Sequence, residues 1–170
     1  MTETERIPSP QVAQFCERLQ ALSTADRARL KRKAGSPLAE AGDTLGLFYR
    51  LLPYGVSPMQ EELWYLAASL YPLAEGGGSG DLGLTLRRAR TSANAKGLDR
   101  RMATLLDADN SQLPFRLRQT LRYLQSSRIR VNWPGLLDDL LYWSHPDRLV
   151  QRRWARNYYH TEQPFTKGTN

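Results

Sequence analysis

The stretch DRLVQRRWARNYY, residues 147–159, separates into two faces when it is placed on an α-helix. One face is an apolar stripe that recurs every four positions and consists of Val150, Trp154 and Tyr158. The opposite face carries cations at the same spacing, namely Arg148, Arg152 and Arg156, with Tyr159 beside them. Residues four apart are neighbours on a helix, so the pattern predicts an amphipathic helix with one buried face. Like charges at this spacing repel by about 0.2–0.5 kcal/mol per pair, so the arginine row has a cost that needs an explanation.

The same three- and four-residue spacing of apolar residues continues along almost the whole chain, and runs of β-branched residues are absent. This pattern favours an all-α protein, a helical bundle of about eight or nine helices. The predicted helices cover residues 11–22, 25–34, 43–52, 58–72, 82–95, 98–107, 114–127, 134–143 and 147–159. The four tryptophans lie on apolar stripes and are predicted to belong to the core, whereas Tyr159 is a candidate for stacking on a base.

The glycine-rich segment EGGGSG, residues 75–80, is the longest interruption of the helical pattern. It suggests two small lobes, with an N-terminal helical lobe at residues 1–75 and a C-terminal basic lobe at 81–163. Residues 76–80 are then a flexible glycine-rich loop, and residues 164–170 a frayed tail. The alternative is a mobile surface loop within one domain.

The charge of the chain is high and unevenly distributed. Its 170 residues include 24 Lys and Arg and 17 Asp and Glu, which gives a net charge of +7. Residues 1–85 hold 8 basic and 10 acidic residues (−2), and residues 86–170 hold 16 and 7 (+9). This excess predicts an anionic partner, which is nucleic acid, an anionic membrane or an acidic protein, and a binding surface built mostly from the second half.

Only four of the basic residues are lysines. Arginine binds phosphate through two parallel hydrogen bonds and stacks on bases, so a preference for arginine over lysine suits a nucleic-acid partner. The alternative is GC-rich coding, which produces the same preference without any functional meaning. One cysteine excludes an internal disulfide and a cysteine-based zinc site. No apolar run has the length of a membrane span and no secretion signal is recognisable, so we expect a cytoplasmic protein.

Arginines occupy the polar side of four consecutive predicted helices and of the loop SSRIRVNW. The candidate nucleic-acid-binding residues that follow from this pattern are Arg87, Arg90, Arg100, Arg101, Arg118, Arg122, Arg130, Arg148, Arg152 and Arg156. Each one that meets a phosphate releases counterions and gives a salt-dependent affinity. The alternative is a set of solvated helix faces that never meet. Since no base-reading motif is present, we expect binding to the strand backbone without sequence specificity.

We find no catalytic constellation, and we expect no enzyme, no cofactor and no metal. His145 and His160 are isolated. Asp107 with Asp109, and Asp138 with Asp139, are the acids that a Mg²⁺-dependent nuclease would need, but helix ends and polar faces use aspartate in the same way.

The order of segments resembles the CasB-type small subunit of Cascade, the type I-E CRISPR surveillance complex. The matching pieces, which lie between about residues 11 and 160, are FYRLLPYG (48–55), LGLTLRRA (82–89), GLDRRMATLLDAD (97–109), LRQTLRYL (117–124), VNWP (131–134) and the helix through Trp143.

This resemblance implies an all-helical, non-enzymatic protein of two lobes that is present in two copies against the backbone and large subunits. It also implies a basic surface that contacts CRISPR RNA and target DNA, chiefly the target and displaced strands. By resemblance the surface includes Arg32, and also Arg100, Arg101, Arg118, Arg122 and Arg148. The position after DAD is the neutral Asn110, which weakens the case for a phosphate contact there. The alternatives are a purely scaffolding subunit and a free-standing helical nucleic-acid-binding protein.

Overall fold

A computed structural model of the chain describes residues 7–160. Within this range the protein is all-α, as predicted, and no helix there is long and apolar enough to cross a lipid bilayer. The α-helices are α1 (Pro10–Gln20), α2 (Thr24–Arg32), α3 (Leu45–Leu51), α4 (Glu61–Leu70), α5 (Leu82–Ala89), α6 (Ala95–Asp107), α7 (Leu113–Ser126), α8 (Trp133–Leu141) and α9 (Leu149–Tyr159). Short 3-10 helices are η1 (Leu38–Glu40), η2 (Gly42–Thr44), η3 (Pro58–Gln60) and η4 (Tyr71–Leu73). Every predicted helix is confirmed, with shifted ends.

Four of the helices begin at a side chain that caps the first turn. The capping oxygens accept a hydrogen bond from a backbone N–H three residues further on, and they belong to Ser9, Ser23, Asp81 and Asn132. The first N–H groups of a helix have no partner inside it, so these residues fix where α1, α2, α5 and α8 begin.

The end of the predicted helix 82–95 is wrong by six residues and the start of the predicted helix 98–107 by three, and a polar residue explains the first. The predicted helix 82–95 stops at Ala89, because the Asn94 side-chain amide donates to the Ala89 carbonyl (2.8 Å) and α6 then starts at Ala95. Asn competes with the backbone for such hydrogen bonds, which ends the helix despite its apolar period. At the other end of the chain, Arg148 has a left-handed backbone (φ 53°), so α9 starts at Leu149 and not at residue 147.

The buried side chains of residues 7–160 form one continuous apolar cluster that draws on every α-helix of that range. All four tryptophans are at most 2 % exposed, which confirms that they belong to the core. Trp133 and Trp143 donate their indole N–H groups to the backbone carbonyls of Ala74 and Ala108 at 3.0 and 2.9 Å. These rings are therefore used for packing, whereas Tyr159 is half exposed.

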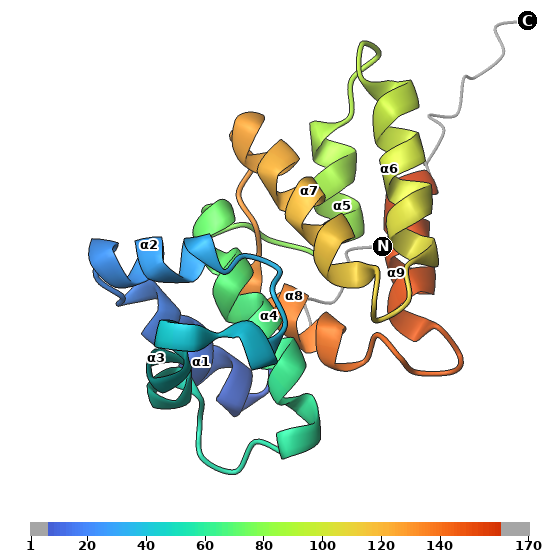
Figure 1. The fold of residues 1–170 in the computed structure, drawn as a ribbon. Coiled ribbons are helices and arrows are strands. Elements are labelled where there is room, and N and C mark those ends of the chain that lie inside the picture. The colour runs from blue at the N-terminus through green and yellow to red at the C-terminus, as the bar shows by residue number, and fades with distance from the viewer. Residues whose placement is uncertain (1–6, 161–170) are drawn as a thin grey trace, which may run out of the picture.

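Helices from the two halves of the chain lie at opposite sides of the molecule. Figure 1 shows α1, α2 and α3 on one side, α5, α6 and α9 on the other, and α4 and α8 between them. Within residues 7–160 the most extensive contact between two helices is that of α5 with α9. It depends on Gly83, since a Cβ atom at that position would lie less than 3.0 Å from the backbone of Trp154.

The glycine-rich segment is paired with the chain before α8. The Val131 N–H donates to the Glu75 carbonyl (2.8 Å), and the Gly78 N–H donates to the Val131 carbonyl (3.2 Å). A side chain at Gly78 would collide with the backbone of Arg130, so glycine is required there. The division into two lobes and the flexibility of residues 76–80 stay predictions, and residues 161–170, including the predicted tail, lie outside the described range.

Candidate nucleic-acid interface

Arg152 and Arg156 form an exposed pair one turn apart on α9. Neither guanidinium has an acidic partner within residues 7–160, and the same holds for the exposed Arg32 on α2 and Arg100 on α6. Arg148 does not extend this row, because it precedes the helix and its guanidinium donates to the Leu106 carbonyl at the end of α6. The structure therefore shortens the predicted row of three arginines to two.

Arg90 is held by an acid that the helical pattern did not indicate. Its Nε and Nη2 groups donate to the two carboxylate oxygens of Asp99 at 3.0 and 3.1 Å. The Tyr158 hydroxyl donates to the same carboxylate. The bonds from Arg90 and Tyr158 hold the pKa of Asp99 below its usual value. Arg90 thus has an internal partner that a phosphate must replace.

Three other predicted arginines also contact their own protein. The Arg101 guanidinium lies 5.2 Å from the centre of the Tyr123 ring, a cation–π distance. Arg87 donates to the His160 carbonyl at 2.7 Å. Arg118 is half-buried against the turn at Gly35, and its Nε atom is buried without a hydrogen-bond partner in the described part of the chain.

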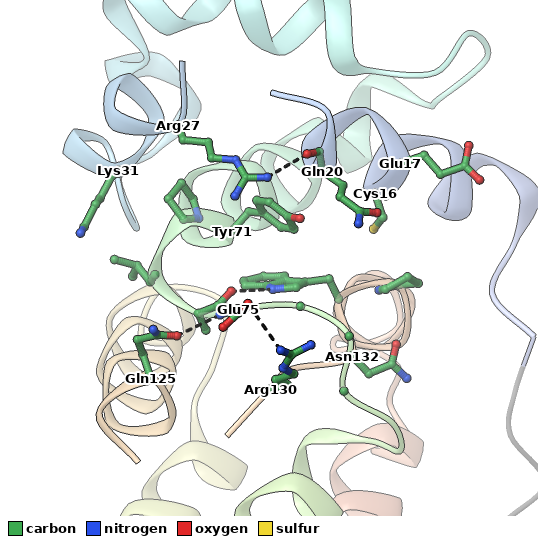
Figure 2. A pocket seen from close by; sticks show the side chains of 18 of the residues that line it. Cys16, Glu17, Gln20, Arg27, Lys31, Tyr71, Glu75, Gln125, Arg130 and Asn132 are labelled. Carbon is green, nitrogen blue, oxygen red and sulfur yellow. Dashed lines mark hydrogen bonds and ion pairs between the residues drawn. The ribbon is translucent and has the colours of Figure 1, made fainter. Parts of the chain in front are cut away.

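Two predicted arginines, Arg122 and Arg130, lie in one hollow of about 1230 Å³ that we name the α2–α7 hollow. Its walls are α1 and α2 on one side and α7 with the segment 130–134 on the other, and residues 71–78 form its floor. Figure 2 shows Arg27 and Lys31 of α2 opposite Gln125 and Arg130. The hollow thus joins cations from both halves of the chain.

The side chains in the hollow are held by a few interactions. Arg27 lies over the Tyr71 ring, 5.5 Å from its centre, and donates to the Gln20 carbonyl at 2.8 Å. Arg130 lies 3.8 Å from a carboxylate oxygen of Glu75, and both side chains are more than 60 % exposed. Because water and salt screen an exposed pair at this distance, Arg130 remains available to another anion.

Cys16 also lines the hollow. It is buried, and burial raises the pKa of its thiol to about 12. Since the thiolate is the nucleophile, a thiol with this pKa is unreactive near neutral pH.

Arg27 and Lys31 were missed by the sequence analysis, which placed the interface in the second half. The local signal was RARLKRK, residues 27–33, a cationic cluster inside a half with a net charge of −2. Not all of it is available, because Arg29 pairs with Asp26 at 3.0 Å and with Asp43 at 3.3 Å. Which of these cations face the second half depends on the packing of α2, which the sequence alone does not show.

The acids considered for a metal site do not gather. Within residues 7–160 no three His, Cys, Asp or Glu side chains are arranged to hold a metal ion. The Asp109 carboxylate caps the turn before α7 by accepting hydrogen bonds from Ser111 and Gln112, and these bonds lower its pKa. The Asp139 carboxylate is buried against Arg153 and Trp154.

Comparison with known proteins identifies the family. Residues 26–159 match the family described as CRISPR-associated protein Cse2. A protein of that name from Thermus thermophilus is 34% identical over 165 residues, which cover 89% of this chain and 90% of the relative. The crystal structure of CasB from M. ruber superimposes with a TM-score of 0.72 at 31% identity, over 88% of this chain and 92% of that one.

A chain of a structure described as a CRISPR RNA-guided surveillance complex shares the fold, with a TM-score of 0.72 at 20% identity over 87% of this chain and 91% of its own length. The family match covers most of the described residues, and the curated relative is similar along nearly its whole length. The chain therefore belongs to the Cse2, or CasB-type, family of CRISPR-associated proteins.

Proposed function

We propose that this chain is the non-catalytic small subunit of a type I-E CRISPR RNA-guided surveillance complex. In this role it binds nucleic acid through arginines without reading its sequence, and it stabilises the target and displaced strands while the DNA duplex is open. Its partners are then the backbone and large subunits, a second copy of itself, CRISPR RNA and target DNA. We place the protein in the cytoplasm, the location expected from its sequence.

The observation that carries this proposal is the set of arginines without internal acids. Of the acids in the second half, Asp99 and Asp139 are bound to Arg90 and Arg153. Arg152 and Arg156 keep exposed guanidinium groups with no acidic partner in the described range. Unpaired guanidinium groups on a helix surface repel one another and are stabilised by phosphates.

Family membership gives these arginines a context. Chains of the same fold occur in a surveillance complex and in E. coli Cascade bound to a double-stranded DNA target. Replacing a DNA duplex by a guide RNA–DNA heteroduplex is nearly balanced in energy, so contacts to the strand backbones decide how long the open state lasts. Arginines that hold a separated strand would slow reannealing.

The test is target retention by the assembled complex. We expect the double variant Arg152→Ala with Arg156→Ala to shorten the lifetime of the open target. The slope of log binding constant against log salt concentration should become shallower by about 0.7–0.9 for each lost phosphate contact. Lys96→Ala, an exposed cation on α6, serves as the control. Unchanged retention and an unchanged salt slope would instead favour the scaffolding role, in which the arginines meet acidic protein surfaces.

A further inference from the structure

We propose that one acidic and apolar face of the chain docks on a different, basic protein, in an apolar recess that is edged with cations. The face is built from α3, the loop after it and η3, and we name it the α3–α4 face. Its exposed apolar side chains are Leu45, Tyr49, Tyr54 and Met59. This inference rests on the proposed function, because it names a face with which a subunit of an assembly contacts another subunit, and the chemistry of that partner.

The first argument is the concentration of exposed apolar side chains. Nine large apolar side chains are exposed among residues 7–160, and four of them lie within residues 45–59. Tyr54 is fully exposed and Met59 is 93% exposed, so neither contributes to the core. A single exposed apolar residue is ordinary, but several in one short segment indicate a contact surface. Tyrosine and methionine are also enriched where proteins meet.

The second argument is that the loop carrying Tyr54 is fixed to the body of the molecule. The Gln11 side-chain amide donates to the Tyr54 carbonyl (3.0 Å), and the Arg18 guanidinium donates to the Leu51 carbonyl (3.0 Å). Val56 packs against the core on the other side of Tyr54. Because a loop that is ordered before binding loses less conformational freedom when a partner arrives, this arrangement favours affinity.

The third argument is that the exposed side of α3 is joined to the start of α4. The Tyr49 hydroxyl donates to the Glu61 carboxylate at 2.7 Å, while about half of the Tyr49 side chain stays exposed. Leu45 lies one turn before Tyr49 on the same side of α3. Figure 1 shows α3 and the chain leading to α4 at the end of the molecule away from α5 and α6. The α3–α4 face is therefore separate from the arginines of α6.

The charge of this region indicates the chemistry of the partner. Residues 36–62 hold four acids and one cation, Arg50, which gives −3 within a chain of net charge +7. One of the acids, Asp43, is paired with Arg29. Such a face repels nucleic acid and anionic membranes and attracts a basic protein. An apolar recess with cations at its edge would thus bury Tyr54 and Met59 and pair with the remaining carboxylates.

The experiment measures how tightly the full-length chain joins the other subunits assembled on CRISPR RNA, which are the probe. The test variant combines Tyr54→Ser with Met59→Ser, and Phe115→Ser removes an exposed apolar side chain outside the face as the control. We expect the double variant to raise the dissociation constant about tenfold or more and the control to change it by less than about twofold. Thermal unfolding should be unchanged in both, because none of these side chains belongs to the core.

A second pair of variants tests the charge of the face. Glu61→Gln removes a carboxylate but keeps an oxygen that accepts the hydrogen bond from Tyr49. We expect it to weaken assembly a few-fold at low salt and to match the wild type at high salt, since salt screens the attraction. Asp107→Asn makes the same charge change at an exposed position on α6 and should have little effect. Equal effects of the two variants would overturn a basic partner for this face.

The outcomes separate this inference from the proposed function. If the wild type does not join the assembly, the proposed function fails and the docking face fails with it. If the wild type joins and the Tyr54 and Met59 double variant joins equally well, only the docking face is wrong.

Two further measurements exclude other occupants of the face. The double variant should bind fluorescent oligothymidine as the wild type does, and a loss there equal to the loss of assembly would mean that the face holds nucleic acid. Sedimentation of the free chain should also be unchanged. If the double variant abolishes self-association, the face binds a second copy, and the inference of a different partner is overturned.

Discussion

On α9, Arg153 differs from its neighbours Arg152 and Arg156 because its guanidinium lies between two buried carboxylates. Its Nε atom is 3.4 Å from Asp81, which caps α5, and its Nη2 group donates to Asp139 on α8. Both carboxylate side chains are 5% exposed. Burial raises the pKa of Asp139, and the bond from Arg153 opposes that rise. One arginine therefore links three helices, a role that its place in the sequence RRWAR did not reveal.

We expect Arg153→Met to lower the free energy of unfolding by about 3 kcal/mol, because it removes the Arg153 guanidinium from two buried carboxylates. Arg153→Lys should recover part of this loss, since an ammonium group keeps the charge but lacks the planar set of N–H donors with which a guanidinium reaches two carboxylates. Urea denaturation near neutral pH measures the difference. Arg152→Met is the matched control and should change stability by less than about 0.5 kcal/mol. If Arg153→Met is as stable as this control, the buried pair does not stabilise the fold.

Asp99 is a second single residue that contributes to the stability of the fold, and its contribution depends on pH. Its pKa is lowered in the folded protein by the hydrogen bonds from Arg90 and Tyr158. A carboxyl whose pKa is lower in the folded state stabilises the fold above its unfolded pKa, and this stability is lost as the pH falls through the folded pKa. Asp99→Asn should therefore destabilise the protein near neutral pH and differ progressively less from the wild type in acid.

Urea unfolding over a pH series checks this expectation. Asp107→Asn serves as the control, because Asp107 is exposed and has no ion partner in the described part of the chain. Parallel stability curves for Asp99→Asn and the wild type from neutral to acid pH would contradict the assignment of this bond to the ionised carboxylate.

At the scale of helices, the contact between α5 and α9 depends on a missing side chain. Alanine in place of a helical glycine normally stabilises a protein by about 0.5–1 kcal/mol. At Gly83 the added Cβ would lie within 3.0 Å of the Trp154 backbone, so Gly83→Ala should instead cost about 1–3 kcal/mol by forcing the helices apart. Gly97→Ala on α6 meets no atom within 4 Å and should stabilise. Thermal unfolding of both variants measures the contrast, and a gain at both positions would show that the helices adjust freely.

The existence of the helices was predictable because the apolar period is a local property. Leu82, Leu86 and Ala89 form the buried side of α5, and the helix ends where the Asn94 side chain bonds back to the Ala89 carbonyl. The same amide also donates to the Tyr123 hydroxyl on α7 at 2.7 Å. A helix end that is fixed by a polar side chain beyond the helix cannot be found from periodicity.

At the scale of the whole molecule, the sequence predicted which residues are cationic and exposed but not which of them meet. Arg122 and Arg130 were predicted as separate features, of a helix and of a loop, and share one hollow. Arg90 was predicted as available and is bound to Asp99 from the next helix. Ion pairs and shared cavities depend on the packing of distant segments, so charge counting over halves of the chain located the basic surface only coarsely.

Substitution of two glutamates distinguishes the effect of the net charge on strand binding from the effect of where that charge lies. Glu75→Gln and Glu40→Gln both raise the net charge from +7 to +8, but only Glu75 lines the hollow beside Arg130. Because the Glu75 pair is exposed and long, its loss should change stability by less than about 1 kcal/mol. Removing that carboxylate frees Arg130 for phosphate, so Glu75→Gln should tighten oligothymidine binding several-fold and steepen the salt slope, whereas Glu40→Gln should act weakly. Equal gains in a salt titration would mean that overall charge, and not the hollow, governs attraction of the strand.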